Sequence, residues 1–188
     1  MKLVVGLGNP GEEYVNTRHN AGFYMLDLYL ESKGLTNYKN KFNGQYIIAA
    51  VNEEKVIFLK PQSFMNLSGE VVRKFADFYK ISVDDILIVH DDLDISLGSF
   101  KLKSSGSSGG HNGLKNIESH LKTQKYKRLK IGISHFDDCS TIDYVLGKFK
   151  KDEQEIMEKL SIIVGNVLDD YFKMSFDTLM NKYNRKVR

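Results

Sequence analysis

Hydrophobic positions along this chain fall into two patterns, short apolar runs and longer stretches in which apolar residues recur every three or four positions. The apolar runs at residues 2–5 and 85–90 predict strands, and the second predicts a central strand buried on both faces of a sheet. A turn at residues 52–54 predicts that the runs on either side of it form paired strands. The predicted strands beyond the first two are residues 45–51, 55–59, 100–103 and 128–133.

The three-to-four-residue spacing predicts amphipathic helices between these strands. The first follows Thr17, a suitable N-cap, and ends at Gly34, a suitable residue just past a helix end. The other predicted helices follow Asn66, occupy residues 111–121, and run from residue 156 to residue 171. Interleaved strands and helices predict an α/β fold, with a twisted mixed, mainly parallel β-sheet flanked by helices. We expect one domain over residues 1–188.

Composition places the chain among ordinary globular proteins, with 41% hydrophobic and 27% charged residues. Its single cysteine, Cys139, excludes an internal disulfide and fits a reducing compartment. No run approaches the roughly 20 apolar residues that span a membrane. The N-terminus does not have the pattern of a signal peptide, because glycines follow the short apolar run at once. We therefore expect a cytoplasmic protein that has no contact with a membrane.

Basic residues are unevenly distributed, although the net charge is only +3. Lysine and arginine concentrate at Lys101 and Lys103, within residues 122–130, and in the tail 182–188. Such clusters suit a polyanionic partner. A solvated surface explains them equally well before other observations are added.

Residues 6–11 match the G-x-G-x-x-G pattern of dinucleotide-binding folds. In those folds the glycines lead directly into a helix whose N-terminus binds the pyrophosphate. Here Pro10 has no backbone N–H to donate, and the predicted helix begins only near Arg18. We therefore interpret the segment as a tight turn that brings Asn9 into a cleft, and we expect no cofactor.

Residues 106–110 match G-x-S-x-G, the nucleophile elbow of many serine hydrolases, with Ser108 at its centre. That elbow normally follows a buried central strand, whereas the strand before it here carries Lys101 and Lys103. A segment with four serines and three glycines also matches easily by chance. We therefore interpret residues 104–110 as a mobile loop. A serine esterase that uses Ser108 stays open as an alternative.

Residues 90–94, His-Asp-Asp-Leu-Asp, lie at a predicted strand end and lack the ligand spacing of a metal site. A carboxylate there suits another role, that of orienting a histidine as the acid does in a catalytic triad. His19 is a suitable partner, because a helix N-terminus disfavours the charged imidazole and leaves it neutral, able to take a proton near pH 7. The amides of Asn66 and Asn112, at the heads of two other helices, suit binding of a water or a carbonyl oxygen.

Together these motifs resemble the bacterial peptidyl-tRNA hydrolase family. The matching blocks follow the same order along nearly the whole chain, which a chance motif would not do. They are VGLGNPG at 5–11, Tyr14, TRHNAG at 17–22, Pro61, FMNLSG at 64–69, DDLD at 91–94, GS at 106–107, GGHNGL at 109–114, RLKIGI at 128–133 and VLGKF at 145–149.

The resemblance implies a metal-free, usually monomeric α/β enzyme. Such an enzyme hydrolyses the ester between a peptide, or an N-acyl amino acid, and the 3′ end of tRNA, and so recycles tRNA released by stalled translation. It implies that His19 is the general base that activates water and that Asp91 orients it. A module that binds tRNA without catalysis is a further alternative.

The resemblance also implies roles around the reacting ester. Asn9, Asn66 and Asn112 would position the peptide, the ester carbonyl and the water. Tyr14 and Met65 would shape the cleft near the tRNA terminus. Lys103 and Lys130 would contact tRNA phosphates, with Arg128 as a further candidate contact.

The chain departs from the family pattern at two places. Lys130 stands where many relatives have arginine, so a bidentate phosphate grip becomes a point charge. Ser134-His135-Phe136 stands where many relatives have a glycine and then a proline two positions on. Contacts on that side of the site therefore follow less directly from the resemblance.

Overall fold

A seven-stranded β-sheet forms the centre of the computed structural model, which describes residues 1–184. Its strand order is β2-β3-β4-β1-β5-β7-β6. The central strands β4 (Glu54–Pro61), β1 (Lys2–Gly6), β5 (Ile86–Asp92) and β7 (Lys127–Gly132) are parallel. The outer strands β2 (Lys39–Lys41), β3 (Gly44–Val51) and β6 (Phe100–Lys103) pair antiparallel. The prediction of a mixed sheet is confirmed, with parallel pairing at its centre.

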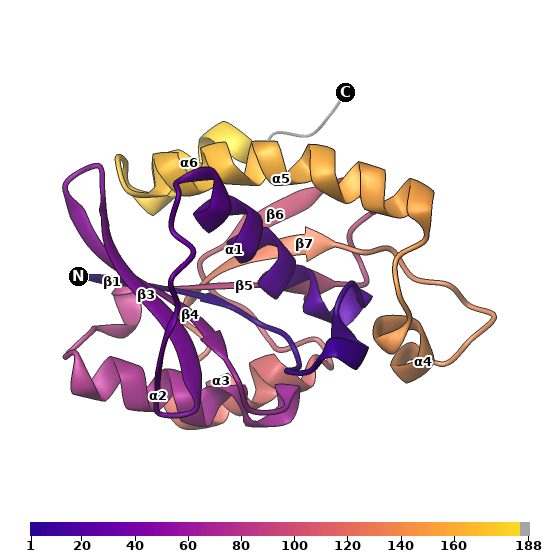
Figure 1. Cartoon of the computed structure of the whole chain (residues 1–188), viewed down its shortest axis with the longest axis horizontal. Helices are drawn as coiled ribbons and strands as arrows, with labels where there is room; N and C mark the ends of the chain where they lie inside the picture. The colour runs from indigo at the N-terminus through magenta and orange to yellow at the C-terminus, as the bar shows by residue number, and fades with distance from the viewer. Residues whose placement is uncertain (185–188) are drawn as a thin grey trace.

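Helices cover both faces of the sheet (Figure 1). On one face lie α1 (Ala21–Ser32), α5 (Lys151–Tyr171) and α6 (Phe176–Tyr183). On the other face α2 (Ser68–Phe78) packs beside α3 (Asn112–Leu121). The short helix α4 (Thr141–Leu146) lies near the end of the sheet where β7 finishes. Short 3-10 helices occur at Glu12–Tyr14, Arg18–Asn20, Met65–Leu67 and Val83–Asp85.

Alternate residues of the central strands supply the two cores. Leu3 and Val5 pack under α2 and α3, whereas Val4 between them packs under α1 and α5. Strand β5 repeats the pattern with Ile88 on the α2 side and Val89 on the α1 side. Because both faces of these strands are buried, each strand is a continuous apolar run in the sequence.

The structure adds elements that the hydrophobic pattern did not predict. Strand β2 has the sequence Lys-Asn-Lys, so it has no apolar signal, and α5 begins at Lys151 with a polar first turn. Helices α4 and α6 are short, yet each begins after a serine whose side chain accepts a backbone N–H, Ser140 and Ser175. These N-caps were the signal by which the two helices were detectable.

Helix α1 begins later than predicted and passes very close to the sheet. Its start is Ala21, after the 3-10 turn Arg18–Asn20, and the Thr17 hydroxyl donates to the Tyr14 carbonyl instead of capping the helix. A Cβ on Gly22 would lie 2.3 Å from the Val89 carbonyl oxygen, so only glycine fits. This approach places the turn that carries His19 over the end of β5.

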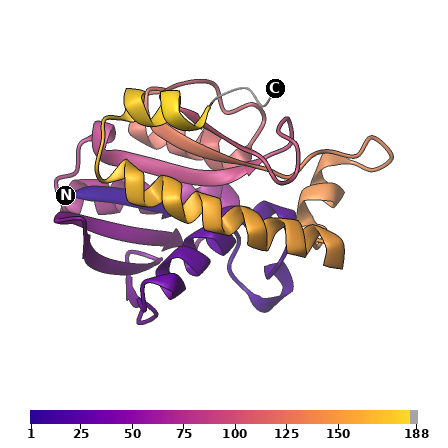
Figure 2. The ribbon, with the colours of Figure 1, turned by 90° about the horizontal axis from the view of Figure 1, so that it is seen from above.

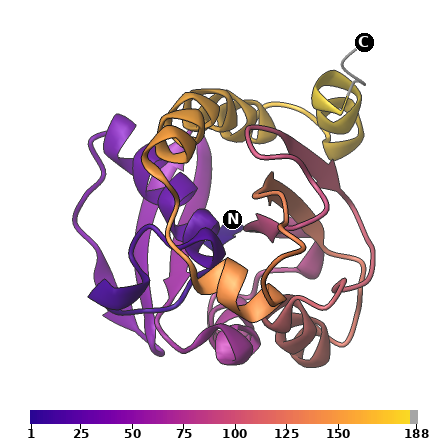
Figure 3. The same cartoon turned by 90° about the vertical axis from the view of Figure 1, so that its right-hand side faces the viewer.

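The carboxyl ends of the central strands lie at the right of Figure 1 and face the viewer in Figure 3. Seen from above, α5 crosses the sheet obliquely, and the segment before α4 projects beyond it (Figure 2). Ligands bind at this edge in open α/β sheets. Within residues 1–184, every helix is too short or too polar to cross a membrane.

The candidate active site

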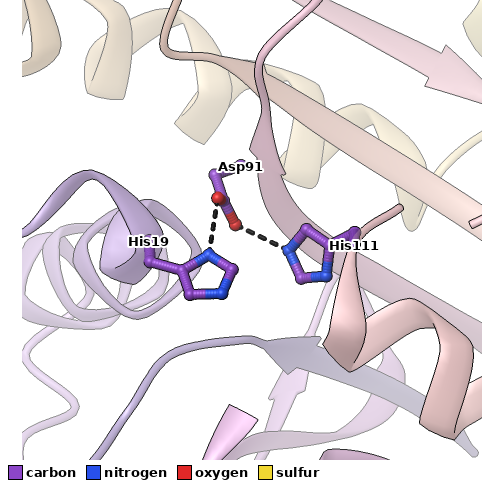
Figure 4. Close-up of side chains that lie close together, drawn as sticks. All are labelled: His19, Asp91 and His111. Carbon is purple, nitrogen blue, oxygen red and sulfur yellow. Dashed lines mark hydrogen bonds and ion pairs between the residues drawn. The ribbon is translucent and has the colours of Figure 1, made fainter. Parts of the chain in front are cut away.

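Asp91, near the carboxyl end of β5, is the centre of a hydrogen-bonded group of three side chains (Figure 4). His19 Nδ1 lies 2.7 Å from Asp91 Oδ2, and His111 Nε2 lies 2.8 Å from Asp91 Oδ1. The sequence analysis paired His19 with Asp91, and the fold brings them together. The sequence analysis assigned no role to His111, which is the second partner of the same carboxylate.

The proton positions on both imidazoles follow from their partners. His111 is the N-cap of α3, and its Nδ1 accepts the Leu114 N–H at 3.3 Å. Because Nδ1 accepts, Nε2 carries the proton that is donated to Asp91. His19 donates from Nδ1 to the other carboxylate oxygen, so its Nε2 keeps a free lone pair. The His111 ring is therefore fixed through both of its nitrogens, whereas the His19 ring keeps one nitrogen that can accept a proton.

The turn that carries His19 is held from the C-terminal part of the chain. The backbone N–H of Arg18 donates to the Gly147 carbonyl at 3.0 Å. The Arg18 guanidinium pairs with Glu153 at 3.0 Å and lies 4.3 Å from the centre of the Tyr144 ring. These contacts hold the turn against the end of α4 and the start of α5, and they restrain the position of His19.

The carboxylate dominates the electrostatics of the site. Burial opposes the charged form of His19, but the charge and hydrogen bond of Asp91 outweigh it, so the pKa of His19 is raised. Burial likewise opposes ionisation of Asp91, yet His111 and His19 hold the pKa of that carboxyl well below its usual range. The expectation that a helix N-terminus disfavours the charged His19 is therefore wrong. Helix α1 starts two residues after His19, whereas the Asp91 carboxylate is hydrogen-bonded to the imidazole itself.

His90 supports the group from inside the protein. Its Nδ1 donates to the backbone carbonyl of Asp91 at 2.7 Å, and its ring centre lies 5.2 Å from that of His111. Burial and the neighbouring His111 lower the pKa of His90 to about 3. His90 is therefore neutral and packs against His111, one of the two histidines that hold the carboxylate.

Asn9 is presented by the glycine-containing turn, as the sequence predicted. Its backbone N–H and carbonyl bond the side chain of Asn20 at 2.8 and 2.9 Å. Its Oδ1 accepts the Met65 N–H at 2.7 Å, which fixes the orientation of the amide. Asn9 Nδ2 has no hydrogen-bond partner among residues 1–184 and remains a donor for a ligand. Asn9 and Asn20 also line a cavity of about 350 Å³.

The other residues predicted to bind substrate differ in their exposure. Asn66 and Asn112 are exposed, and neither side chain has a hydrogen-bond partner in the described part of the chain. Tyr14 is half-buried, with its ring centre 6.5 Å from that of Phe64. Met65 is only 4% exposed, so little of its side chain is available as a contact surface.

Two of the three predicted phosphate contacts have accessible side chains. Lys103 ends β6 and is half-buried, and Lys130 on β7 lies 3.3 Å from Asp92. Arg128 is fully buried and donates to backbone carbonyls of Gly106, Ser107 and Gln124. The predicted phosphate contact of Arg128 is therefore wrong for this structure, because its guanidinium is turned inward and occupied.

The remaining basic and divergent segments are only partly placed by the structure. In the basic tail, Lys182 pairs with Asp170 at 2.7 Å, and residues 185–188 lie outside the described part. Ser134 stands where many relatives have glycine, and it adopts a φ of 57° that favours glycine. Its hydroxyl accepts the Leu97 N–H at 2.8 Å, which helps to hold this backbone.

The three central side chains also form a group that could hold a metal ion, because their ligand atoms lie within 4.8 Å of one another. A metal held by the two nitrogens that face Asp91 would need the lone pairs of His19 Nδ1 and His111 Nε2. The Leu114 N–H already occupies the His111 Nδ1 lone pair, which places the proton on Nε2. The separations of 2.7 and 2.8 Å to the carboxylate are those of hydrogen bonds. The geometry thus favours a proton-bearing triad.

Ser108 does not have the partner that a serine nucleophile needs. Among residues 1–184, no histidine is hydrogen-bonded to its hydroxyl, and its backbone carbonyl accepts the His111 N–H at 3.0 Å. The site instead offers a histidine base that a buried carboxylate orients, beside free amide donors. This chemistry suits the activation of water. Fold and site together define a hydrolase of the α/β class.

Comparison with known proteins identifies the family. The family model described as peptidyl-tRNA hydrolase matches residues 3–188. A peptidyl-tRNA hydrolase of Lactobacillus johnsonii is 47% identical over 185 residues, covering 98% of this chain and 100% of the relative. One of Clostridium botulinum is 44% identical over 184 residues, covering 98% and 97%.

A crystal structure of the Acinetobacter baumannii peptidyl-tRNA hydrolase gives a TM-score of 0.90 at 37% identity, covering 98% of this chain and 94% of that one. The chain belongs to the peptidyl-tRNA hydrolase family. It is an ester-bond hydrolase that acts on peptidyl-tRNA, as the resemblance implied.

Proposed function

We propose that this enzyme cleaves the ester of peptidyl-tRNA by direct attack of a water molecule that His19 activates. The bond of 2.7 Å between His19 Nδ1 and Asp91 supports this most directly, because it leaves Nε2 as the basic atom of the ring. The ionised Asp91 stabilises the imidazolium that forms when Nε2 accepts the proton. His111 binds the second carboxylate oxygen and so prevents Asp91 from rotating away from His19.

The reaction balances with no other reagent. The water oxygen bonds to the ester carbonyl carbon as its proton moves to His19 Nε2, which gives a tetrahedral intermediate. The bond from this carbon to the tRNA 3′ oxygen then breaks, and His19 returns the proton to that oxygen. The products are the peptide carboxylic acid and free tRNA.

The three asparagines supply the hydrogen bonds for this reaction. Asn9 Nδ2 is a fixed donor, since its Oδ1 is bound to the Met65 N–H. Asn66 and Asn112 are exposed amides, suited to the ester carbonyl and the water. Donors aimed at the carbonyl oxygen stabilise the negative charge that develops on it. Tyr14 and Met65 shape the surface around them.

The test is turnover of an N-acylaminoacyl-tRNA by the wild-type enzyme, with and without EDTA, and after treatment with a fluorophosphonate. We expect neither EDTA nor the fluorophosphonate to change turnover, because the proposed base needs neither a metal nor a serine. Loss of turnover with EDTA would contradict the metal-free mechanism. Labelling of Ser108 with loss of turnover would establish the serine esterase, and tRNA binding without peptide release would establish a non-catalytic module.

We propose that Lys103 and Lys130 contact tRNA phosphates. They lie on neighbouring strands, β6 and β7, and the register of these strands places both side chains on the same face of the sheet. Phosphate contacts by such ammonium groups release counterions and make binding depend on salt. Lys130 gives a point charge rather than a bidentate grip, and Asp92 holds it at 3.3 Å.

Lys103→Ala is expected to raise KM and to leave kcat nearly unchanged. Because one phosphate contact is lost, the slope of log KM against log salt should fall by about one. The matched control is Lys159→Ala, which removes the same charge from an exposed position on α5. An unaltered slope in Lys103→Ala would remove Lys103 from the tRNA site.

We propose that the enzyme works as a monomer in the cytoplasm, where translation produces its substrate. Its single cysteine, Cys139, is exposed and free, which fits a reducing compartment. Light scattering should give the mass of one chain, 21.5 kDa. A dimer mass at micromolar concentration would contradict the monomer.

A further inference from the structure

Arg128 is an unusual buried cation. Arg128 has the greatest volume of the fully buried residues in the described part of the chain. Within residues 1–184 no carboxylate forms an ion pair with it. Its guanidinium instead donates to the Ser107 carbonyl at 2.8 Å, to the Gln124 carbonyl at 3.0 Å and to the Gly106 carbonyl. It lies 4.2 Å from the centre of the Tyr126 ring. A buried charge whose partners are all neutral is costly, so a specific role is expected of it.

The carbonyls of Gly106 and Ser107 belong to the Ser/Gly loop, residues 104–110, which joins β6 to α3. This loop begins directly after Lys103, which is the cross-strand partner of Arg128. It ends at His111, whose backbone N–H donates to the Ser108 carbonyl at 3.0 Å. Arg128 therefore holds the loop that connects Lys103, a proposed phosphate contact, to His111, which bonds Asp91.

A loop of serines and glycines has many accessible conformations, and ordering it costs entropy. Gly106 has a φ of 149°, a backbone conformation that residues other than glycine rarely adopt. Its N–H donates to the Gln124 carbonyl at 3.2 Å, the same carbonyl that Arg128 binds. The fork of the guanidinium thus ties two loop carbonyls and Gln124 into one rigid unit.

We propose that Arg128 is a positioning residue, which fixes the Ser/Gly loop and thereby holds His111 against Asp91. It does not contact tRNA. The restraint of the loop is a property of the free protein. The effect on the reaction rests on the proposed function, because it requires that His111 supports the catalytic carboxylate.

The first measurement is hydrogen exchange of the backbone amides in the free protein. Arg128→Met keeps the length of the side chain and removes its charge and donors. We expect the Gly106 and His111 amides to exchange at least about tenfold faster, because local opening controls exchange. The melting temperature should stay the same or rise, since an apolar side chain replaces an unpaired buried charge.

Lys125→Met is the matched control, because it removes one exposed charge from the segment before β7. Its loop amides should exchange at the wild-type rate. Wild-type exchange of these amides in Arg128→Met would overturn the proposal. If Arg128→Met does not fold, Arg128→Lys keeps the cation but not the fork, and its loop amides should also exchange faster. A folded lysine variant with wild-type exchange would equally overturn it.

The second measurement is the kinetics of N-acylaminoacyl-tRNA hydrolysis by the same variants. In Arg128→Met we expect kcat to fall about tenfold while the salt slope of KM stays at the wild-type value. A slope reduced by about one with unchanged kcat would make Arg128 a phosphate contact and overturn the proposal. Faster exchange of the loop amides with unchanged kcat and unchanged salt slope would support the restraint of the loop by Arg128. It would contradict the proposed role of His111 in the reaction.

Discussion

His19→Ala is expected to lower kcat for peptidyl-tRNA hydrolysis by roughly a thousandfold or more, the range that a general base contributes. The variant loses the imidazole Nε2, which is free to accept a proton while Asp91 holds the ring through Nδ1. The amides of Asn9, Asn66 and Asn112 stay in place, so KM should change little. Single-turnover release of an N-acyl amino acid from tRNA measures the loss directly.

The control for His19→Ala is Ser108→Ala, which should keep most of the activity. Ser108 lies in the Ser/Gly loop, and its hydroxyl has no histidine partner in the described part of the chain. The reverse pattern, with Ser108 essential and His19 dispensable, would exclude the water-activation mechanism. Thermal unfolding should show that both variants are folded, so that a loss of activity is not a loss of folded protein.

Asp91→Asn has the second large expected effect, a fall in kcat of about 10²- to 10⁴-fold, as when the acid of a catalytic triad is replaced by its amide. The carboxylate accepts from both His19 and His111. An asparagine presents one oxygen and one NH₂ group, so one histidine must turn or shift its proton. The base is then no longer held with its free lone pair on Nε2.

The same substitution should move the pH dependence of kcat/KM. In the wild-type enzyme the pKa of His19 is raised, so activity is lost as the pH falls through a midpoint above the ordinary histidine value. Without the carboxylate, burial alone remains, and it lowers the pKa of His19. The midpoint should therefore shift to lower pH. Asp94→Asn, at an exposed position three residues along, should keep the wild-type midpoint.

A wild-type midpoint in Asp91→Asn would show that another group controls the ionisation of His19. His111 bonds the carboxylate from α3, and His90 on β5 bonds the backbone carbonyl of Asp91, so each is tested for a shift of its own by NMR of the imidazole Cε1–H signals. Agreement between the His19 signal and the kinetic midpoint would tie the profile to the base.

Much of the fold is determined by local signals in the sequence. Val4 and Val89 lie in runs that are apolar on both faces, and such runs are stable only inside a sheet covered by helices. Pro10 and the late helix start already argued against a nucleotide cradle and favoured a turn that presents Asn9. The ordered motifs identified the family. The strand β2 escaped because it has no apolar residue, and α4 because it is only six residues long. Helix α6 does have apolar residues at helical spacing, Phe176, Leu179, Met180 and Tyr183, and the sequence analysis missed that signal.

The pairing of the site residues was decided by the tertiary structure. His111 meets Asp91 because the N-cap geometry of α3 and the end of β5 converge, and no spacing in the sequence encodes that distance. Arg128 looked like a surface cation until the antiparallel pairing of β6 with β7 placed the Ser/Gly loop over it. The pKa of His19 likewise depends on a carboxylate 72 positions away in the chain. Local pattern specifies which elements form, whereas charge, burial and proton position depend on contacts between distant residues, which only the packed fold creates.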